Sequence, residues 1–277
     1  MVRVVPAALS TGLSSIPLTT GSMKLLILGA TGNMGQRLLA QALARGHAVT
    51  AFVRNRAKLQ QQLGTAVPPG LTVFEGDVND ATALRAAMTG QDVVINCAGY
   101  VADGAAFIEL VDRVVTQAEA ALGPGGRLWL FGGAAALDVP GTDIMGADLP
   151  GVPAIYKAHQ TNYRRVAASR LDWSLMCPGP MVPSSTGQAR TDLRISKDVW
   201  PFPRPGYTRW LPRIATSLAF KNHAPEMIVS YDDVAAVLLD HLPAGGRFSR
   251  ARVGVALPEG QRGEKVYEQS GKTVKIG

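Results

Sequence analysis

Residues 23–35 read MKLLILGATGNMG, and this stretch decides the fold. The apolar run Leu25–Leu28 is typical of a strand that is buried on both faces of a parallel sheet. Glycines at three positions then let the backbone turn tightly, approach phosphates and pack a following helix closely: Gly29, Gly32 and Gly35. The first amides of such a helix have no partner within it and can receive a pyrophosphate. The stretch predicts a dinucleotide-binding βαβ unit; the alternative is a βαβ unit that binds no phosphate.

The residue after the second predicted strand distinguishes between the two nicotinamide cofactors. The first predicted helix ends at Arg45, Gly46 follows it as a stop, and a strand over residues 47–53 leads to Arg54. An acidic residue here would bind a ribose hydroxyl of NAD, whereas an arginine pairs with the 2′-phosphate of NADP. We therefore expect NADP(H) to be preferred over NAD(H), unless Arg54 and Arg56 are only solvated loop residues.

Length and composition suit one α/β domain. The 277 residues are 47% hydrophobic and 18% charged. No apolar run approaches the roughly 20 residues that a bilayer requires. We expect a disordered leader or an upstream extension over residues 1–22, the domain over 23–257, and a polar, loosely docked tail over 258–277.

The cysteines and the charge bear on compartment and partners. Cys97 and Cys177 end the fourth and sixth predicted strands, which lie about 10 Å apart, too far for a disulfide; this favours a cytoplasmic protein. The formal net charge is +7. Part of the excess lies in one basic stretch: Arg190, Arg194, Lys197, Arg204, Arg209, Arg213 and Lys221. No nucleic-acid motif accompanies it, and an anionic cofactor or substrate explains it equally well.

Strands and helices go on alternating, as a doubly wound parallel sheet requires. Further strands are predicted at 71–75, 91–96, 127–131 and 173–177, with helices from residue 80 and over 105–122 and 154–170. Ligands bind in such folds at the carboxyl ends of the strands, where the strand order reverses. These strand ends are Gly29, Arg54, Asp77, Ala98, Gly132 and Pro178. The sequence thus predicts a Rossmann-type sheet with helices on both faces.

Six motifs together carry a family resemblance: GATGNMG (29–35), GDVND (76–80), NCAG (96–99), FGGAA (131–135), LDWSLMCPGPM (171–181) and SYDDVA (230–235). Over roughly residues 23–255 the chain resembles the atypical, NmrA-like branch of the short-chain dehydrogenase/reductase superfamily. That branch consists of single-domain NAD(P)H-binding proteins, which include biliverdin-IXβ and flavin reductases and redox-sensing regulators.

The resemblance implies a cofactor site but no metal site. It places Arg54 at the 2′-phosphate and Asp77 and Val78 beside adenine. It assigns the pyrophosphate to Gly29, Thr31, Gly32, Asn33, Met34 and Gly35. It assigns the ribose and the nicotinamide to Cys97, Ala98, Gly99, Tyr100, Pro178 and Met181. For Asp77, a role as a turn or cap residue is the alternative.

The proton relay of the larger superfamily is absent from the sequence. Its usual acid is a tyrosine with a lysine four residues later, but Gln160 stands four residues after Tyr156 and no other tyrosine has that spacing. Lys157 is adjacent to Tyr156, and adjacent helical residues point about 100° apart, so the two cannot face one substrate atom. Tyr156, Lys157 and His159 remain candidate proton donors. Alternatively, Tyr156, His159 and Tyr163 form an aromatic face packed on the sheet.

Residues 182–223 follow the sixth strand and are expected to shape the substrate site. Their aromatic residues favour an apolar lid with a cationic rim, or else a loop packed over the core or in a dimer contact: Trp200, Phe202, Tyr207 and Trp210.

Two functions stay open. One is an NADPH-dependent reductase of a small, conjugated or planar acceptor that takes its proton from solvent. The other is a non-catalytic NADP(H)-binding redox sensor that acts through a protein partner. A homodimer is compatible with either, and nucleic acid is not expected. Isomerase or epimerase chemistry is disfavoured because it depends on the missing Tyr-Lys pair.

Overall fold

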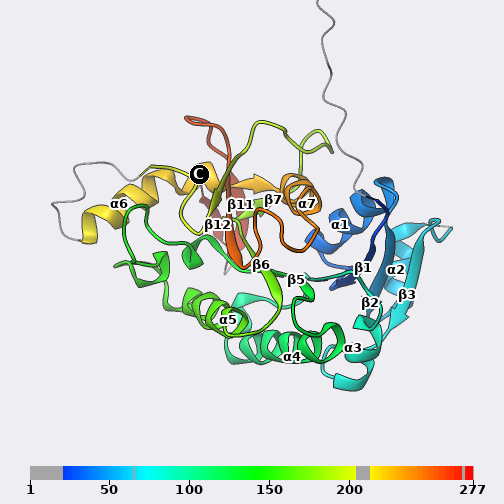
Figure 1. Ribbon diagram of the computed structural model, residues 1–277. Coiled ribbons are helices and arrows are strands. Elements are labelled where there is room, and N and C mark those ends of the chain that lie inside the picture. Colours follow the sequence, from blue (N-terminus) through cyan, green and yellow to red (C-terminus); the bar gives the residue numbers. More distant parts are fainter. Residues whose placement is uncertain (1–20, 65, 204–212, 270–271, 277) are drawn as a thin grey trace, which may run out of the picture.

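An eight-stranded sheet forms the centre of the molecule (Figure 1). The computed structural model describes residues 21–64, 66–203, 213–269 and 272–276. The strand order across the sheet is β3 (Leu71–Glu75), β2 (Ala48–Val53), β1 (Lys24–Leu28), β4 (Val93–Asn96), β5 (Arg127–Phe131), β6 (Asp172–Cys177), β10 (Ala251–Ala256) and β8 (Arg194–Lys197).

The sheet confirms the predicted doubly wound topology. Neighbouring strands run parallel, except that β8 pairs antiparallel with β10. Strands β3 and β5 have the bounds predicted from the sequence. The order reverses between β1 and β4, which each have apolar residues buried on both faces. The crevice at their carboxyl ends is where ligands bind in this fold.

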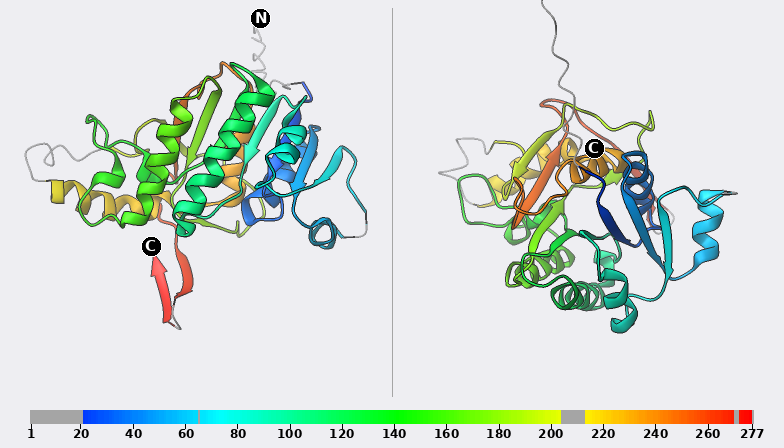
Figure 2. Two further views of the ribbon diagram at one scale, coloured as in Figure 1. Left: turned by 90° about the horizontal axis from the view of Figure 1, so that it is seen from below. Right: turned by 45° about the vertical axis from the view of Figure 1, so that its right-hand side comes forward.

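Helices cover both faces of the sheet (Figures 1 and 2). One face carries α1 (Asn33–Ala44), α2 (Arg56–Leu63) and α7 (Tyr231–Leu239). The other carries α3 (Ala81–Met88), α4 (Ala105–Leu122) and α5 (Lys157–Ala167). In α4 the buried side chains recur every three to four residues, so one stripe of the helix faces the sheet: Phe107, Val111, Val114, Val115 and Ala118. The helix predicted at 154–170 is a 3₁₀ turn, η4 (Ala154–Tyr156), followed by α5.

Several elements were not predicted from the sequence. Besides β8 and β10, these include α6 (Arg213–His223) and a short parallel pair, β7 (Met181–Val182) with β9 (Val229–Ser230). Within the expected polar tail, β11 (Lys265–Gln269) and β12 (Lys272–Ile276) pair as an antiparallel hairpin. Figure 2 shows this hairpin projecting from the domain. Of the expected leader, residues 1–22, all but the last two lie outside the described residues.

The aromatic residues of the expected lid divide into two groups. Trp200 and Phe202 are only 3% and 5% exposed, and both pack against Phe220 of α6, with ring centroids 4.5 and 6.3 Å away. These two rings therefore belong to the core and do not offer an exposed apolar lid surface. Tyr207 and Trp210 lie outside the described residues.

The two cysteines are free thiols, and two arginines of the basic stretch have acidic partners. Cys97 directly follows β4 and Cys177 ends β6, so strand β5 lies between the strands that carry these two free thiols to the sheet edge. Burial raises the pKa of Cys177 to about 12 and raises that of Cys97 as well, so both stay protonated at neutral pH. Arg190 pairs with Asp192 and Arg194 with Glu226, while Arg204 and Arg209 lie outside the described residues. No described helix is long and apolar enough to cross a membrane.

A buried ion pair joins β5 and β6 at the amino end of the sheet. Arg127 is 2% exposed, and its Nη1 lies 3.0 Å from Oδ1 of Asp172. Its Nε donates to the carbonyl of Leu242, and Asp172 accepts from the amide of Gly245. Burial lowers the pKa of Arg127 to about 10, although Asp172 counteracts this. The pair therefore ties the chain after α7 to the sheet.

Replacing Asp172 should destabilise the protein much more than breaking an exposed pair. Asp172→Ala leaves the Arg127 cation buried without its anion, and we expect the free energy of unfolding to fall by about 3–5 kcal/mol. Asp240→Ala removes the exposed partner of Arg45 and should cost less than about 1 kcal/mol. Urea unfolding of both variants checks this comparison. Equal losses would show that the burial of the Arg127 pair does not matter.

Candidate functional site

The turn between β1 and α1 requires two glycines. Gly29 has a φ of +75°, and a Cβ at this position would lie 2.8 Å from the amide nitrogen of Ala98. A Cβ at Gly35 would lie 2.2 Å from the carbonyl oxygen of Gly29. Both distances are shorter than any side chain tolerates, so glycine alone allows α1 to start directly above β1. These are the turn and packing roles that the sequence predicted for the two residues.

The start of α1 is open toward the carboxyl edge of the sheet. Gly32 is its N-cap, and neither a side-chain cap nor an acidic residue occupies the first turn, which lies wholly in the described part. Asn33 and Met34 provide the first helical amides, next to Gly32, which donates its own amide to Gly29. Thr31 accepts hydrogen bonds at its carbonyl from two glutamine side chains. The free amides and the helix dipole suit an anion.

Arg54 and Arg56 have different surroundings. Arg56 donates to the carbonyl of Val73 at 2.9 Å, and its Nε lies 3.9 Å from Glu75. Arg54 directly follows β2, is exposed, and forms no ion pair with any residue in the described ranges. Only Arg54 therefore has its guanidinium free to meet a phosphate.

Asp77 is held in a local turn. Its Oδ1 accepts the amide of Asn79 at 2.8 Å, which agrees with the turn role that the sequence left open. The cap of α3 is Asp80, which accepts the amides of Thr82 and Ala83. Val78 is partly buried against the core beneath α3 and α4.

The loop after β4 is shaped by a buried side chain. Asn96 is 2% exposed, and its amide group bonds both the amide and the carbonyl of Ala98. This loop brings partly exposed Cys97 and Gly99, with a φ of +101°, to the sheet edge. Tyr100 follows and is 66% exposed.

The segment after β6 returns toward α1. The carbonyl of Pro178 accepts the amide of Ala134, and β7 then pairs Met181 with Val229 of β9. Strand β9 leads into α7, where Ser230 and Asp233 form a capping box. The next residue after Ser230 is Tyr231, whose hydroxyl lies 3.5 Å from Nδ2 of Asn33.

The candidate proton donors lie where α5 begins. The Tyr156 ring is 38% exposed and stacks on His159, with centroids 6.2 Å apart and an interplanar angle of 11°. Lys157 is exposed. Tyr163 packs edge-on against Trp173, so His159 and Tyr163 are packed as the aromatic-face interpretation predicted.

His159 is a buried, neutral imidazole. It is 7% exposed, and its Nδ1 has no hydrogen-bond partner among the described residues. It meets the edge of Phe107, and a Cβ at Gly133 would lie 2.8 Å from its Nε2. Burial lowers the pKa of His159 to about 4. An imidazolium is therefore scarce at neutral pH, which argues against His159 as the proton donor.

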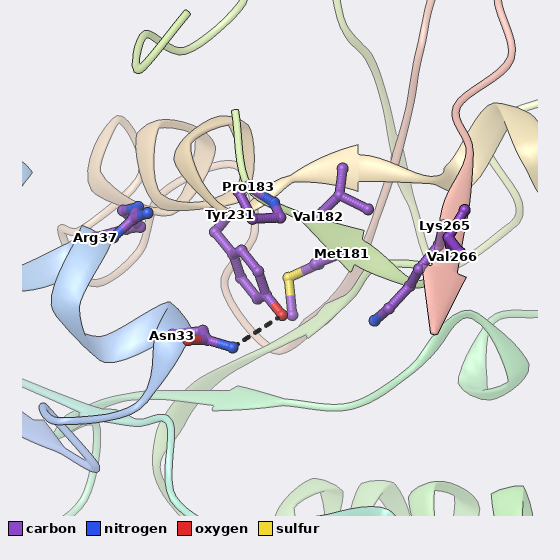
Figure 3. Close-up of a pocket in the computed structure, with 8 residues that line it drawn as sticks. All are labelled: Asn33, Arg37, Met181, Val182, Pro183, Tyr231, Lys265 and Val266. Carbon is purple, nitrogen blue, oxygen red and sulfur yellow. Dashed lines mark hydrogen bonds between the residues drawn. The ribbon is translucent and has the colours of Figure 1, made fainter. Parts of the chain in front are cut away.

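A cavity of about 320 Å³ lies between the start of α1, the segment after β6, α7 and the carboxyl-terminal hairpin (Figure 3). It is lined by Asn33, Arg37, Met181, Val182, Pro183, Tyr231, Lys265 and Val266. The sequence assigned Asn33 and Met181 to the cofactor site and placed Val182 and Pro183 in the segment 182–223 expected to shape the substrate site. Tyr231 belongs to the SYDDVA motif but had no predicted role in a site, and Arg37, Lys265 and Val266 were not predicted. The alternation in KVYEQ at 265–269 is a strand signal that could have indicated the hairpin. No three His, Cys, Asp or Glu side chains in the described ranges are grouped to hold a metal ion.

A family comparison identifies the class of this chain. Residues 29–243 match the model of a family described as NAD(P)H-binding. The chain belongs to this NAD(P)H-binding family. The match covers the glycine turn, the crevice and α7, and it confirms the family resemblance seen in the motifs. It ends before β10 and the hairpin.

Curated relatives are similar over short stretches. An uncharacterized protein of Mycobacterium tuberculosis is 37% identical over 76 residues, which are 27% of this chain and 8% of that protein. An isoflavone reductase homolog of maize is 31% identical over 94 residues, 32% of this chain and 30% of that protein. The matched stretches thus span less than a third of either relative.

Solved structures resemble the whole domain. A putative exported protein of Burkholderia pseudomallei has a TM-score of 0.62 at 25% identity, covering 84% of this chain and 99% of that one. A putative NADH-flavin reductase of Streptococcus pneumoniae has a TM-score of 0.59 at 20% identity, covering 85% and 100%. An anaerobilin reductase of Escherichia coli has a TM-score of 0.58 at 21% identity, covering 86% and 98%. The last two likenesses show the Rossmann fold.

Burial of His159 should make the protein sensitive to acid. Its pKa is lowered from 6.5 to about 4, so between these values the unfolded chain binds a proton that the folded chain does not. Stability is therefore lost as the pH falls through this window. His159→Gln should reduce the loss between about pH 7.5 and about pH 4.5 by about 2–3 kcal/mol. Urea unfolding at both pH values measures it. The pKa of His47 is also lowered, but His47 is present in both proteins, so its contribution cancels in the comparison. An equal loss of stability in His159→Gln and the wild-type protein would contradict the prediction.

Proposed function

We propose that this chain is an NADPH-dependent oxidoreductase that reduces a small, conjugated organic acceptor. The observation that carries the proposal is the composition of the carboxyl edge of the sheet. Along this edge lie the uncapped start of α1 and the free Arg54, and also two exposed tyrosines, Tyr100 after β4 and Tyr156 at the start of α5. The first two suit a phosphorylated dinucleotide and the rings suit a flat, apolar acceptor.

The residues present fit NADP(H). The backbone space at Gly32 and the amides of Asn33 and Met34 would hold the pyrophosphate, and Arg54 would pair with the 2′-phosphate. The loop 97–100 and the segment from Pro178 to Met181 would flank the nicotinamide. Bound NADPH supplies a hydride from C4 of the nicotinamide ring.

Solvent is the proposed source of the proton. Reduction of the acceptor consumes one hydride and one proton and leaves NADP⁺. His159 is neutral and buried, and no lysine stands four residues after Tyr156 to activate it. Lys157 is adjacent to Tyr156 in the sequence, so the two side chains point in different directions. The protein then contributes by holding the acceptor ring against the nicotinamide. Two of the similar solved structures, the putative NADH-flavin reductase and the anaerobilin reductase, support a conjugated acceptor.

Absorbance at the reduced nicotinamide band tests this function directly. Purified protein and NADPH are mixed with flavins, quinones and linear tetrapyrroles, and we expect oxidation with at least one acceptor. Tyr156→Phe should keep kcat within about threefold, because a lost general acid would cost about 100-fold or more. A loss of that size would assign the proton to Tyr156. Tight NADPH binding without oxidation by any acceptor would instead favour the nucleotide sensor.

Arg54 should determine the cofactor preference. Arg54→Gln removes the partner of the 2′-phosphate, and we expect NADPH to bind about 10- to 100-fold more weakly while NADH binding changes less than about twofold. Fluorescence titration of both cofactors measures these affinities. Arg45→Gln, which removes the same charge next to Asp240, is the matched control. A parallel loss for NADH and NADPH would rule out recognition of the 2′-phosphate by Arg54.

A further inference from the structure

The cavity beside α1 combines apolar walls with two cations. Met181, Val182, Pro183 and Val266 supply apolar surface, and Tyr231 supplies an aromatic ring with a hydroxyl. The cations, Arg37 and Lys265, come from α1 and β11. A cavity of this kind suits a ligand that is largely apolar or planar and carries an anionic group.

The two cations differ in how their charge is balanced. The Nε of Arg37 lies 3.5 Å from Oδ2 of Asp232, a carboxylate that is largely buried. Lys265 has no acidic partner within the described ranges. In Figure 3 its ammonium group points from β11 toward Met181, on the far side of Tyr231 from Asn33. An ammonium group that points into a cavity and has no anionic partner is ready to bind an anion.

The position of Lys265 is determined by an anchored segment. The amide of Leu257 donates to the carbonyl of Glu226 at 2.7 Å, and the amide of Gly263 donates to that of Pro225 at 2.9 Å. A Cβ at Gly263 would lie 2.3 Å from the carbonyl oxygen of Ile228, so the chain passes in direct contact with the segment before β9. Lys265 follows two residues later. The hairpin therefore starts from a fixed point beside the cavity and adds a wall that the family match, which ends at residue 243, does not include.

We propose that Lys265 binds an anionic oxygen group of the ligand that fills this cavity. The inference rests on the proposed NADPH-dependent function, because the cavity adjoins the start of α1 at Asn33. Two sources carry the same chemistry: the pyrophosphate of the cofactor, and a phosphate or carboxylate on the acceptor. In either case the carboxyl-terminal hairpin takes part in ligand binding through one charged side chain.

The test uses Lys265→Gln in the full chain. Lys24→Gln removes the same charge from an exposed lysine at the start of β1 and serves as the matched control. Lys24 lies at the amino end of the strands, whereas the cavity adjoins their carboxyl end. Three ligands are titrated by fluorescence: NADPH, and then FMN and riboflavin in the presence of NADP⁺. FMN and riboflavin share one ring system and differ in a phosphate, so their comparison isolates the anion on an acceptor.

Each outcome decides the question. Contact with the pyrophosphate predicts that Lys265→Gln weakens NADPH binding roughly tenfold, and contact with the acceptor predicts the same loss for FMN but not for riboflavin. If FMN does not bind the wild-type protein, the NADPH affinities of the two variants alone test the inference. If Lys265→Gln and Lys24→Gln have the same affinity for every ligand that binds, the inference is overturned and the proposed function stays intact. Failure of the wild-type protein to bind NADPH refutes the proposed function, and the inference with it.

Discussion

The close approach of three backbone segments at the carboxyl end of β1 is the constraint on which the site depends. Positions 29 and 35 have no room for a Cβ, because Ala98 contacts one and the Gly29 carbonyl contacts the other. Without that space α1 could not start directly above β1, and its amides would not open onto the crevice. Helix α7 packs on α1, so the same approach also holds Asn33 opposite Tyr231. The glycine turn thus positions both the candidate phosphate site and one wall of the cavity.

The surroundings of α5 explain how the polar residues at this edge of the sheet are packed. His159 is packed between Tyr156, Phe107 and the backbone at Gly133, and this burial keeps the imidazole neutral. A residue held in that way supports the ring of Tyr156 by stacking and leaves the phenol partly open to water. Under the proposed function, chemistry at this edge depends on orientation more than on acid catalysis and takes its proton from solvent.

The sequence predicted the elements whose pattern is local and missed those that depend on distant contacts. The first six parallel strands follow from apolar runs ended by turn residues. Strand β10 was missed because Arg252 and Gly254 interrupt its apolar pattern; Asp138 neutralises the arginine, and Ser196 of β8 fills the space at the glycine. The burial of Trp200 depends on packing with α6. In the site, Arg54 and the glycines were recognisable motifs, whereas Tyr231 and Lys265 reach the cavity only through the β7–β9 pairing and the anchored hairpin.

Two cations that are unpaired in the described part of the chain, Arg54 and Lys265, bear on the proposed anionic ligand at the sheet edge. Arginines that support the fold have carboxylate partners, as Arg127 has Asp172 and Arg194 has Glu226. Arg54 and Lys265 lack such partners within the described ranges. Arg54 follows β2 and Lys265 stands beside the segment after β6, so they flank the β1–β4 crevice from opposite sides. A dinucleotide crosses this fold at that crevice, with negative charge at its phosphorylated ribose and at its centre. The unpaired charges of Arg54 and Lys265 therefore support the proposed dinucleotide, which carries its negative charge at its phosphates.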